Sequence, residues 1–287
     1  MISVKKKILI ARLLNRVLGF LRGLTGRNMR VQCRRRGVKW DLDLNEGIDL
    51  SIYMLGAYES RTMRAYERVI RPGAVVFDIG ANIGAHTLHF ARLVGPAGRV
   101  FAFEPTDFAM AKLRSNLGLN PDLVPRVLLQ QCFLVADRTD QPPSSIPSSW
   151  PVANQHDDLN LEHLGKPQSL TAATTLTADD FCQREGISRI DFVKIDVDGH
   201  EYPVLRGFHQ SLLRFRPLIL IEIAPFIYEG ENAGEFEEFV RFLDALRYDF
   251  TDANTGHTLP HDAAALRQLI TPGGGVNALL MPRPDQP

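Results

Sequence analysis

The sequence predicts an α/β fold in which helices cover both faces of a mostly parallel sheet. Short apolar runs alternate with longer helix-like segments from residue 75 onward, as in sheets built from strand–helix–strand units. A glycine-punctuated turn at 78–84 follows the first run, and Glu104 ends the second. Glycines let the backbone approach a ligand closely, and an acid at the second strand end suits ribose hydroxyls. These features predict a nucleoside-cofactor site.

The expected strands and helices follow in chain order. Residues 75–79 are the first strand, because they are apolar and follow the turn at 71–73. The helix after it is closed by glycine and proline at 95–98. By the same patterns we expect strands at 99–103, 127–132, 190–195, 218–223, 248–251 and 277–281, and helices at 83–94, 107–119, 177–185, 202–213 and 234–246.

The alternation is interrupted between residues 138 and 170. The run from Pro142 to Pro151 is rich in proline and serine, which excludes a regular element of any length. An irregular insertion of this size inside a compact domain is usually functional or disordered. Trp150 in this run either stacks on a sugar ring or anchors the loop.

Three parts are expected along the chain. Residues 1–45 are a basic extension that we expect to be helical, although residues 40–44 alternate as a half-buried strand does. Residues 46–74 are a helical lead-in that covers the sheet, with a helix starting at Ser60. Residues 75–287 form the cofactor-binding domain, with the irregular insertion at 138–170.

Charge is distributed very unevenly along the chain, although the net charge is zero. Residues 1–39 hold twelve basic residues and no acidic one, so the remainder carries a net charge of −12. Nucleic acid is not expected as a partner, because Phe20 is the only aromatic residue of the basic segment and the acidic remainder repels phosphate.

The apolar run from Ile8 to Leu24 is interrupted by Arg12, Arg16 and Arg22. It is therefore unlike a membrane span, which needs about 20 apolar residues, and unlike a signal peptide, which needs an unbroken apolar centre. Two interpretations stay open. One is an amphipathic helix on an anionic membrane surface, with contacts from residues 1–39. The other is a helix packed on the main domain with its basic face in water.

The three cysteines, Cys33, Cys132 and Cys182, are neither clustered nor spaced as metal ligands. They are expected to be reduced thiols. This indicates a cytoplasmic protein, placed at the inner face of the membrane if the basic segment binds lipid.

The motif Asp78-x-Gly80-x-Asn82-x-Gly84 differs from the usual dinucleotide fingerprint in its acidic first position. A pyrophosphate would be repelled by Asp78, whereas a cationic amino-acid cofactor would not be. S-adenosylmethionine carries a sulfonium, an ammonium and no phosphate. The motif together with Glu104 therefore favours S-adenosylmethionine, and a nicotinamide-dependent oxidoreductase is the alternative.

A second group of titratable residues follows the apolar run 190–195. His200 is a candidate general base, because imidazole titrates near neutrality, and Asp196 could orient it or contact the cofactor. A turn at Asp198 and a helix start after it would explain the same residues without catalysis. Asp196, Asp198 and Glu222 could also bind a divalent cation. Their spacing does not require one, and no metal is predicted.

Several ordered motifs resemble the FkbM-type family of S-adenosylmethionine-dependent methyltransferases. They are Val76–Gly84, Ala102–Pro105, Val193–Glu201, Val204–Gly207 and Arg216–Glu222, with a lead-in at 49–59. The resemblance covers about residues 40–285. It implies a Rossmann-like class I methyltransferase fold, with a seven-stranded, mostly parallel sheet, an antiparallel last strand and helices on both faces. It also implies O-methylation of hydroxyls on saccharides, glycolipids or polyketide-like acceptors.

The resemblance also implies roles for single residues. Asp78, Gly80, Asn82 and Gly84 would shape the methionine end of the cofactor site, Glu104 would hold the ribose, Asp137 would lie near the adenine, and Asp196 would lie beside the transferred methyl. One departure is Asp198, where the family more often has glutamate. A third alternative is an inactive membrane-surface binding protein that keeps the fold.

Overall fold

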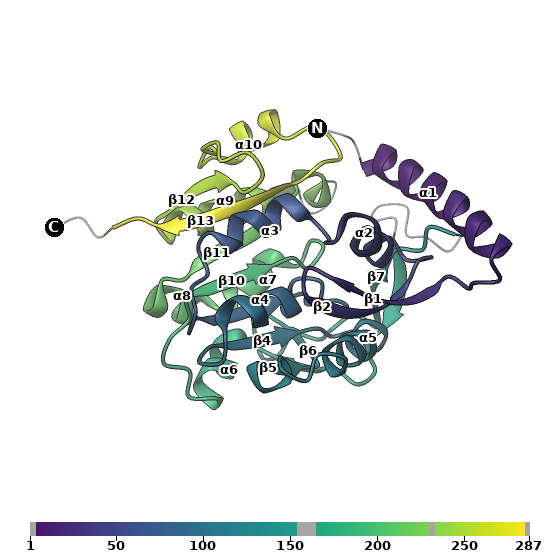
Figure 1. The fold of residues 1–287 in the computed structure, drawn as a ribbon. Helices are drawn as coiled ribbons and strands as arrows, with labels where there is room; N and C mark the ends of the chain where they lie inside the picture. The colour runs from purple at the N-terminus through teal and green to yellow at the C-terminus, as the bar shows by residue number, and fades with distance from the viewer. Residues whose placement is uncertain (1–3, 154–164, 230–232, 285–287) are drawn as a thin grey trace.

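A computed structural model describes residues 4–153, 165–229 and 233–284. Its centre is a seven-stranded sheet with the strand order β12-β13-β11-β10-β3-β4-β5 (Figure 1). These strands are β3 (Val75–Ile79), β4 (Arg99–Phe103), β5 (Val127–Gln130), β10 (Phe192–Ile195), β11 (Leu218–Ile223), β12 (Tyr248–Asp252) and β13 (Val276–Pro282).

The sheet confirms the predicted architecture. Neighbouring strands from β11 to β5 are parallel, whereas β13 pairs antiparallel with both β11 and β12. The last strand is therefore the antiparallel one, as expected. The predicted strand at 127–132 is shorter in the sheet, because β6 (Cys132–Leu134) leaves it and pairs with β9 (Thr174–Leu176).

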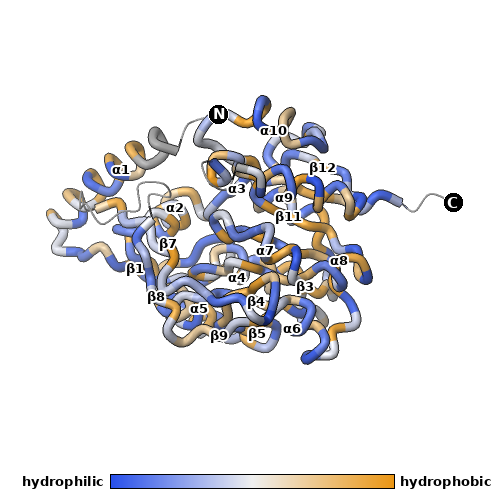
Figure 2. The backbone as a smooth tube through the Cα atoms, turned by 180° about the vertical axis from the view of Figure 1, so that it is seen from behind, coloured by the Kyte–Doolittle hydropathy of each residue, from blue (hydrophilic) through white to orange (hydrophobic). Residues whose placement is uncertain are grey.

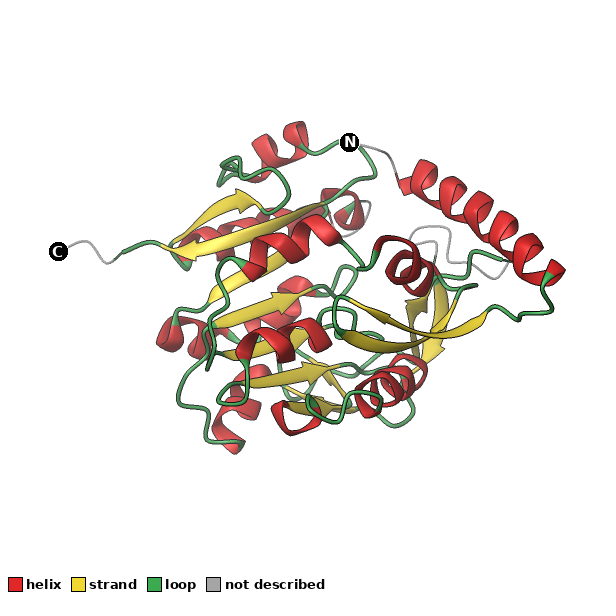
Figure 3. Cartoon of the chain, in the orientation of Figure 1, coloured by secondary structure: helices red, strands yellow, loops and turns green. Residues whose placement is uncertain are grey.

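Helices cover both faces of this sheet (Figure 3). Their bounds are α1 (Val4–Leu24), α2 (Gly47–Leu55), α3 (Ser60–Glu67), α4 (Thr87–Val94), α5 (Asp107–Gly118), α6 (Ala178–Arg184), α7 (Glu201–Arg206), α8 (His209–Phe215), α9 (Ala233–Ala245) and α10 (Ala263–Leu269), with short 3-10 turns η1 (Val124–Arg126) and η2 (Pro225–Tyr228). Successive side chains of a strand point to opposite faces, so Phe77 and Val76 belong to different apolar cores.

The two cores divide the helices between the faces. Phe77 packs in the core that also holds buried side chains of α6, α8, α9 and α10. Val76 packs in the core that holds side chains of α2, α3, α4 and α5, together with Trp40. Burial on both faces explains why the strands are continuously apolar.

Two expected helices differ from the sequence patterns. The helix expected from residue 83 begins at Thr87, because Asn82 has a φ of 47° and its side-chain oxygen accepts a hydrogen bond from the Ile83 amide at 2.8 Å. The helix expected over 202–213 is divided into α7 and α8 at Gly207. A side chain there would place its Cβ 2.0 Å from the Val135 carbonyl oxygen.

The N-terminal extension is helical only in its first half. Residues 30–43 form an antiparallel hairpin of β1 (Arg30–Arg35) and β2 (Val38–Asp43). The expectation of a helical 1–45 segment is therefore wrong for this stretch, since the alternation that suggested a strand at 40–44 extends back to Val38. Trp40 and Leu42 are fully buried under the sheet domain, so tertiary packing selects the strand.

The insertion 138–170 is more regular than its composition suggests. β7 (Ser145–Ser149) and β8 (Lys166–Ser169) pair antiparallel, with a register shift between Pro147 and Ser149. Proline lacks an N–H but is tolerated in an edge pairing or next to a bulge. The expectation of no regular element is wrong at this hairpin. Residues 154–164 of the insertion lie outside the described residues.

Candidate functional site

A cavity of about 300 Å³ lies at the carboxyl ends of the central strands. The chain goes from β3 to its neighbour β4. It later crosses back to β10, which is the neighbour of β3 on the opposite side. Ligands of open parallel sheets bind at such a point, and this volume is typical of a small-molecule site. The described residues lining it are Ile79, Gly80, Asn82, Phe103, Glu104, Pro105, Cys132, Phe133, Leu134, Gln141, Pro143, Ile146, Pro147, Ser148, Asp196, Val197, Asp198, Gly199, His200 and Val204.

The glycine turn after β3 lies against the loop after β10. Gly80 has a φ of 77°, and a Cβ on it would lie 1.8 Å from the Asp196 carbonyl oxygen. Any side chain at residue 80 would therefore collide with main chain as well as strain its own backbone. This close approach places Asp196 and the turn on the same wall of the cavity.

Glu104 forms one end of the cavity and is held by three hydrogen bonds. Its Oε2 accepts from the Asn82 amide at 2.9 Å, and its Oε1 accepts from the Thr106 amide at 2.9 Å and from the Thr106 hydroxyl at 2.5 Å. A carboxylate can accept about four hydrogen bonds, so one acceptor position is left. Burial raises the pKa of Glu104, while the bonds from Thr106 and Asn82 lower it.

The insertion closes this end of the cavity. The hydroxyl of Ser148, in β7, lies 2.9 Å from the Thr106 hydroxyl. The Asn82 side-chain amide donates to the Ser148 carbonyl oxygen at 3.3 Å. Both contacts join the hairpin to the residues that hold Glu104, so the insertion is part of the site.

Lys194 lies beneath the cavity, with a side chain that is 5% exposed. Its Nζ lies 3.6 Å from Asp78 Oδ1 and 3.2 Å from Asp196 Oδ2, and it donates to the Gly80 carbonyl oxygen at 3.1 Å. Burial lowers the pKa of Lys194, but Asp196 and Asp78 more than offset this and raise it. The ammonium group therefore stays charged and ties β10 to the glycine turn.

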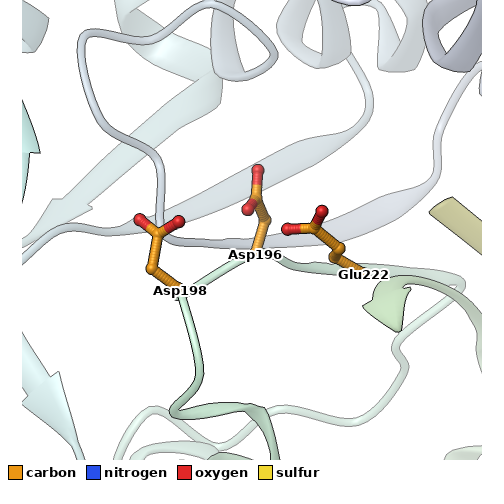
Figure 4. Close-up of side chains that lie close together, drawn as sticks. All are labelled: Asp196, Asp198 and Glu222. Carbon is orange, nitrogen blue, oxygen red and sulfur yellow. The ribbon is translucent and has the colours of Figure 1, made fainter. Parts of the chain in front are cut away.

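An acidic cluster of Asp196, Asp198 and Glu222 forms the other end of the site (Figure 4). Oxygens from the three carboxylates lie within 4.8 Å of one another, with Asp196 between the other two. Burial and the negative charges of Asp196 and Glu201 raise the pKa of Asp198 to about 8. Burial, Asp196 and Asp198 raise the pKa of Glu222 well above its usual range.

This acidic cluster could bind a cation. Hard divalent cations bind carboxylate oxygens. The positively charged ammonium or sulfonium group of a cofactor could lie against the same oxygens. Asp196 and Asp198 line the cavity, whereas Glu222 does not. The absence of a metal stays a prediction from the sequence.

His200 lines the cavity at the start of α7. Its Nε2 lies 3.1 Å from the Leu134 carbonyl oxygen, which can only accept, so Nε2 carries the proton and Nδ1 of the neutral ring keeps its lone pair. Burial lowers the pKa of His200. The Phe133 ring lies 4.5 Å from the imidazole, between ring centroids. His200 is thus fixed and neutral near pH 7, as a general base should be.

The loop from Asp196 to His200 is held by Glu201. This buried carboxylate accepts hydrogen bonds from the Val197 amide at 3.1 Å and from the Gly199 amide at 3.0 Å. Asp198 and Gly199 both have positive φ, of 49° and 100°, so the predicted turn is present. Glu201 begins α7 and acts on the loop, not on the cavity.

Not every residue predicted for the site reaches the cavity. Asp78 is fully buried below it, where its Oδ2 accepts from the Thr87 hydroxyl at 2.6 Å, and Gly84 packs against Leu113. Asp137 is exposed on a turn and accepts from the Thr139 amide at 3.0 Å. Asp137 does not line the cavity, and its assignment to the adenine site stays a prediction.

Three contributors escaped the sequence patterns: Lys194, Thr106 and Ser148. A lysine inside the apolar run 192–195 was the available signal, because buried lysines are rarely unpaired. Thr106 was visible only as a helix start, where its hydroxyl accepts from the Ala109 amide at 3.4 Å. Ser148 carried no signal. Trp150 does not line the main cavity, and its carbonyl oxygen accepts from the Gly47 amide at 2.9 Å, which supports the anchoring interpretation.

The chain matches the Methyltransferase FkbM domain over residues 78–250. It is 28% identical over 172 residues to the 2-O-methyltransferase NoeI of Sinorhizobium fredii, covering 56% of this chain and 68% of that protein. It is 33% identical over 166 residues to the 31-O-demethyl-FK506 methyltransferase FkbM of Streptomyces tacrolimicus, covering 50% and 62%. It is 25% identical over 159 residues to the hexuronic acid methyltransferase AglP of Haloferax volcanii, covering 52% and 55%.

Proposed function

The chain belongs to the FkbM methyltransferase family, and from this premise we propose that it transfers a methyl group from S-adenosylmethionine to a hydroxyl oxygen of a saccharide or polyketide-like acceptor. The names of AglP and FkbM describe one acceptor of each class, a hexuronic acid and 31-O-demethyl-FK506. The matched region spans only 55–68% of the three relatives, so the acceptor class is part of the proposal.

The charge of the cavity carries this proposal. Its described lining residues include three carboxylates, Glu104, Asp196 and Asp198, and no lysine or arginine. A cationic cofactor stabilises the ionised forms of these three side chains, whereas their ionised forms repel a pyrophosphate. The cavity therefore favours S-adenosylmethionine over a nicotinamide dinucleotide.

The residues present fit this cofactor. The remaining acceptor position of Glu104 suits a ribose hydroxyl, and Gly80 lines the cavity while it packs closely against the Asp196 main chain. Asp196 and Asp198 would lie toward the cationic methionine end. When bound, S-adenosylmethionine would supply a methyl group attached to a positively charged sulfur. The acceptor oxygen can bond to this methyl carbon while the sulfur leaves.

The chain itself contributes positioning and a proton acceptor. His200 is neutral and keeps a lone pair on Nδ1, so it can take the proton that the acceptor hydroxyl loses as its oxygen forms the new bond. Asp196 is held by Lys194 at 3.2 Å and balances positive charge in the site. Holding donor and acceptor together supplies most of the remaining acceleration in reactions of this kind.

Calorimetric titration with S-adenosylmethionine tests the cofactor assignment. We expect the full chain to bind it, and Glu104→Ala to weaken binding about 10-fold or more, because a hydrogen bond to a charged group contributes about 1.5–3 kcal/mol. Asp122→Ala is the matched control. This acid is exposed and precedes β5, at the edge of the sheet opposite the cavity.

Two results would contradict the cofactor assignment: unchanged affinity in Glu104→Ala, or NAD displacing S-adenosylmethionine from the wild-type protein. The acceptor is tested separately, by mass spectrometry of glycans and lipids from cells with and without the gene. We expect the loss of one CH₂ increment from a hydroxylated product. A His200→Ala variant should bind the cofactor normally and lose methyl transfer.

A further inference from the structure

The N-terminal helix α1 turns its apolar side chains toward solvent. In the described residues, fourteen large apolar side chains are exposed, and eight of them lie on this one helix. They are between 39% and 70% exposed: Leu9, Ile10, Leu13, Leu14, Val17, Phe20, Leu21 and Leu24. Their spacing of three and four residues places them on one side of a helix. We call this set the α1 apolar face.

The opposite side of α1 attaches the helix to the domain. Asn15 is buried there and donates from its side-chain amide to the Leu44 carbonyl oxygen at 2.8 Å. Ala11 and Leu18 are partly buried against the core next to α2 and β2. Arg22 donates to the Asn28 carbonyl oxygen at 2.8 Å. Asn15, Arg22 and the partly buried Ala11 and Leu18 thus make the attachment, and the apolar face is left without a partner among the described residues.

Exposed apolar surface of this extent on one element marks an interaction site. Figure 1 shows α1 at the periphery of the molecule, and Figure 2 shows hydrophobic and hydrophilic residues alternating along it. Among the described residues no helix is long and apolar enough to cross a membrane.

The charge around the α1 apolar face identifies the occupant. Residues 1–39 carry twelve basic residues and no acidic one, whereas the remainder of the chain has a net charge of −12. Arg16 is exposed at the border of the face, and Arg27, Arg30 and Arg34 follow in the next segment and the hairpin. A basic helix with one apolar side is the form that lies in the headgroup region of an anionic bilayer. The acidic remainder would be repelled by the same surface, which restricts contact to this segment.

We propose that α1 is a peripheral membrane anchor, with its apolar face inserted among the headgroups of an anionic lipid bilayer. The anchor lies near the catalytic cavity. α1 packs on α2, and the Gly47 amide at the start of α2 bonds to the insertion that supplies Ser148 to the cavity wall. A bilayer in contact with α1 would therefore lie beside the insertion 138–170, the part of the site that interrupts the alternation of strands and helices.

Vesicle sedimentation with the full-length protein tests the anchor. One set of vesicles contains only phosphatidylcholine, and the other contains about 30% phosphatidylglycerol, which supplies the negative charge. We expect sedimentation with the anionic set, and a loss of most of it when the salt concentration is raised to about 0.5 M, because the Debye length falls.

Two variants and a matched control separate the apolar from the electrostatic contribution. The double variant Leu13→Asp with Phe20→Asp should weaken binding by at least about 10-fold, since each side chain loses its burial in lipid. Arg16→Glu should weaken binding to anionic vesicles about 5-fold or more. Leu269→Asp, at a leucine that is 58% exposed on α10, should leave binding unchanged. All of these side chains are exposed, so equal melting temperatures are expected.

The proposal would be overturned if the wild-type protein did not sediment with anionic vesicles. Equal binding by the double variant would overturn it too, because the apolar face would then be irrelevant. If the face instead joins two copies of the chain, the wild type will be a dimer in light scattering, the double variant a monomer, and neither will sediment with vesicles. Calorimetry with S-adenosylmethionine is independent of these outcomes, because the α1 variants leave the cavity intact.

Discussion

Glu104 and Asp198 are both carboxylates that line the same cavity, but their surroundings differ. Glu104 accepts three hydrogen bonds from protein donors and has one acceptor position left. Asp198 accepts none from the described residues, and burial together with the negative charges of Asp196 and Glu201 raises its pKa. One end of the cavity is therefore organised before a ligand arrives, whereas at the other end burial and neighbouring carboxylates disfavour the ionised forms of Asp198 and Glu222.

From this difference we expect the two ends to have separate tasks in binding the cofactor. The organised end provides geometry, because a fixed carboxylate selects hydroxyl groups in one place. The acidic end provides charge, because a cation relieves the repulsion among Asp196, Asp198 and Glu222. A ligand with hydroxyls at one end and a positive charge at the other satisfies both, and S-adenosylmethionine is such a molecule.

Removing Lys194 should produce the largest effect, because it breaks the acidic end. Lys194→Met leaves the fully buried Asp78 without its counter-charge, and loss of one partner of a buried ion pair costs about 3–5 kcal/mol. We expect a decrease of this size in the free energy of unfolding, measured by urea denaturation.

Two further variants give this prediction its controls. Lys166→Met changes an exposed lysine of β8 and should leave stability within about 0.5 kcal/mol. Adding Asp78→Asn to Lys194→Met should recover part of the loss. A stable Lys194→Met protein would show that the ion pair does not hold the acidic end.

The organised end should be the next most sensitive. Glu104→Gln puts an NH₂ group where two backbone amides and a hydroxyl now donate, so at least one donor loses its acceptor. We expect a loss of about 1.5–3 kcal/mol in unfolding free energy. Glu235→Gln, at an exposed position of α9, is the control. If both variants are equally stable, Glu104 is not preorganised by its neighbours.

The acidic end should make the free energy of unfolding depend on pH. The pKa of Asp198 is raised to about 8 in the folded protein, against about 3.9 in an unfolded chain. Between these values the unfolded chain has released the proton that the folded protein still binds, so this group loses stabilising effect as pH rises. Asp198→Asn, which does not titrate, should therefore gain stability relative to wild type between about pH 4 and 8.

The measurement is the difference in unfolding free energy between Asp198→Asn and wild type at a series of pH values. We expect it to grow by more than about 1.4 kcal/mol, the equivalent of one pKa unit. Taking the difference cancels the opposite effect of His200, whose pKa is lowered by burial. Saturating S-adenosylmethionine should reduce the slope. A flat difference would mean that Asp198 is ionised without penalty.

The smallest effect is expected at the hairpin. Ser148→Ala removes a hydroxyl that lies 2.9 Å from the Thr106 hydroxyl, and a neutral hydrogen bond contributes about 0.5–1.5 kcal/mol. We expect a decrease in cofactor affinity of less than about 10-fold by calorimetry. Ser144→Ala, exposed in the same insertion, should have no effect. A larger loss for Ser148→Ala would mean that the hairpin contributes more than this contact.

Predictability from sequence followed the range of the interactions. The glycine turn, Glu104 and most strands were predicted, because each depends on residues close in the chain: apolar runs, turn glycines and acids at strand ends. The break at Gly207 was not, and neither was the close approach of this glycine to the Val135 carbonyl oxygen, 72 residues away in the chain. That Asp137 does not line the cavity was not predictable either, because the departure of β6 toward β9 leaves no local signal.

The sequence alone determined the order of strands and helices along the chain, the acidic residue that opens the glycine turn, and the family resemblance. Each of these depends on residues that are neighbours in the chain. Only the tertiary structure decided which carboxylates share the cavity, that Lys194 lies between Asp78 and Asp196, that Ser148 reaches Thr106, and that α1 leaves its apolar face in solvent. These facts depend on strand register and on packing between distant segments. The role of each of these side chains depends on its distance from residues that are far away in the chain. A local sequence pattern does not contain these distances.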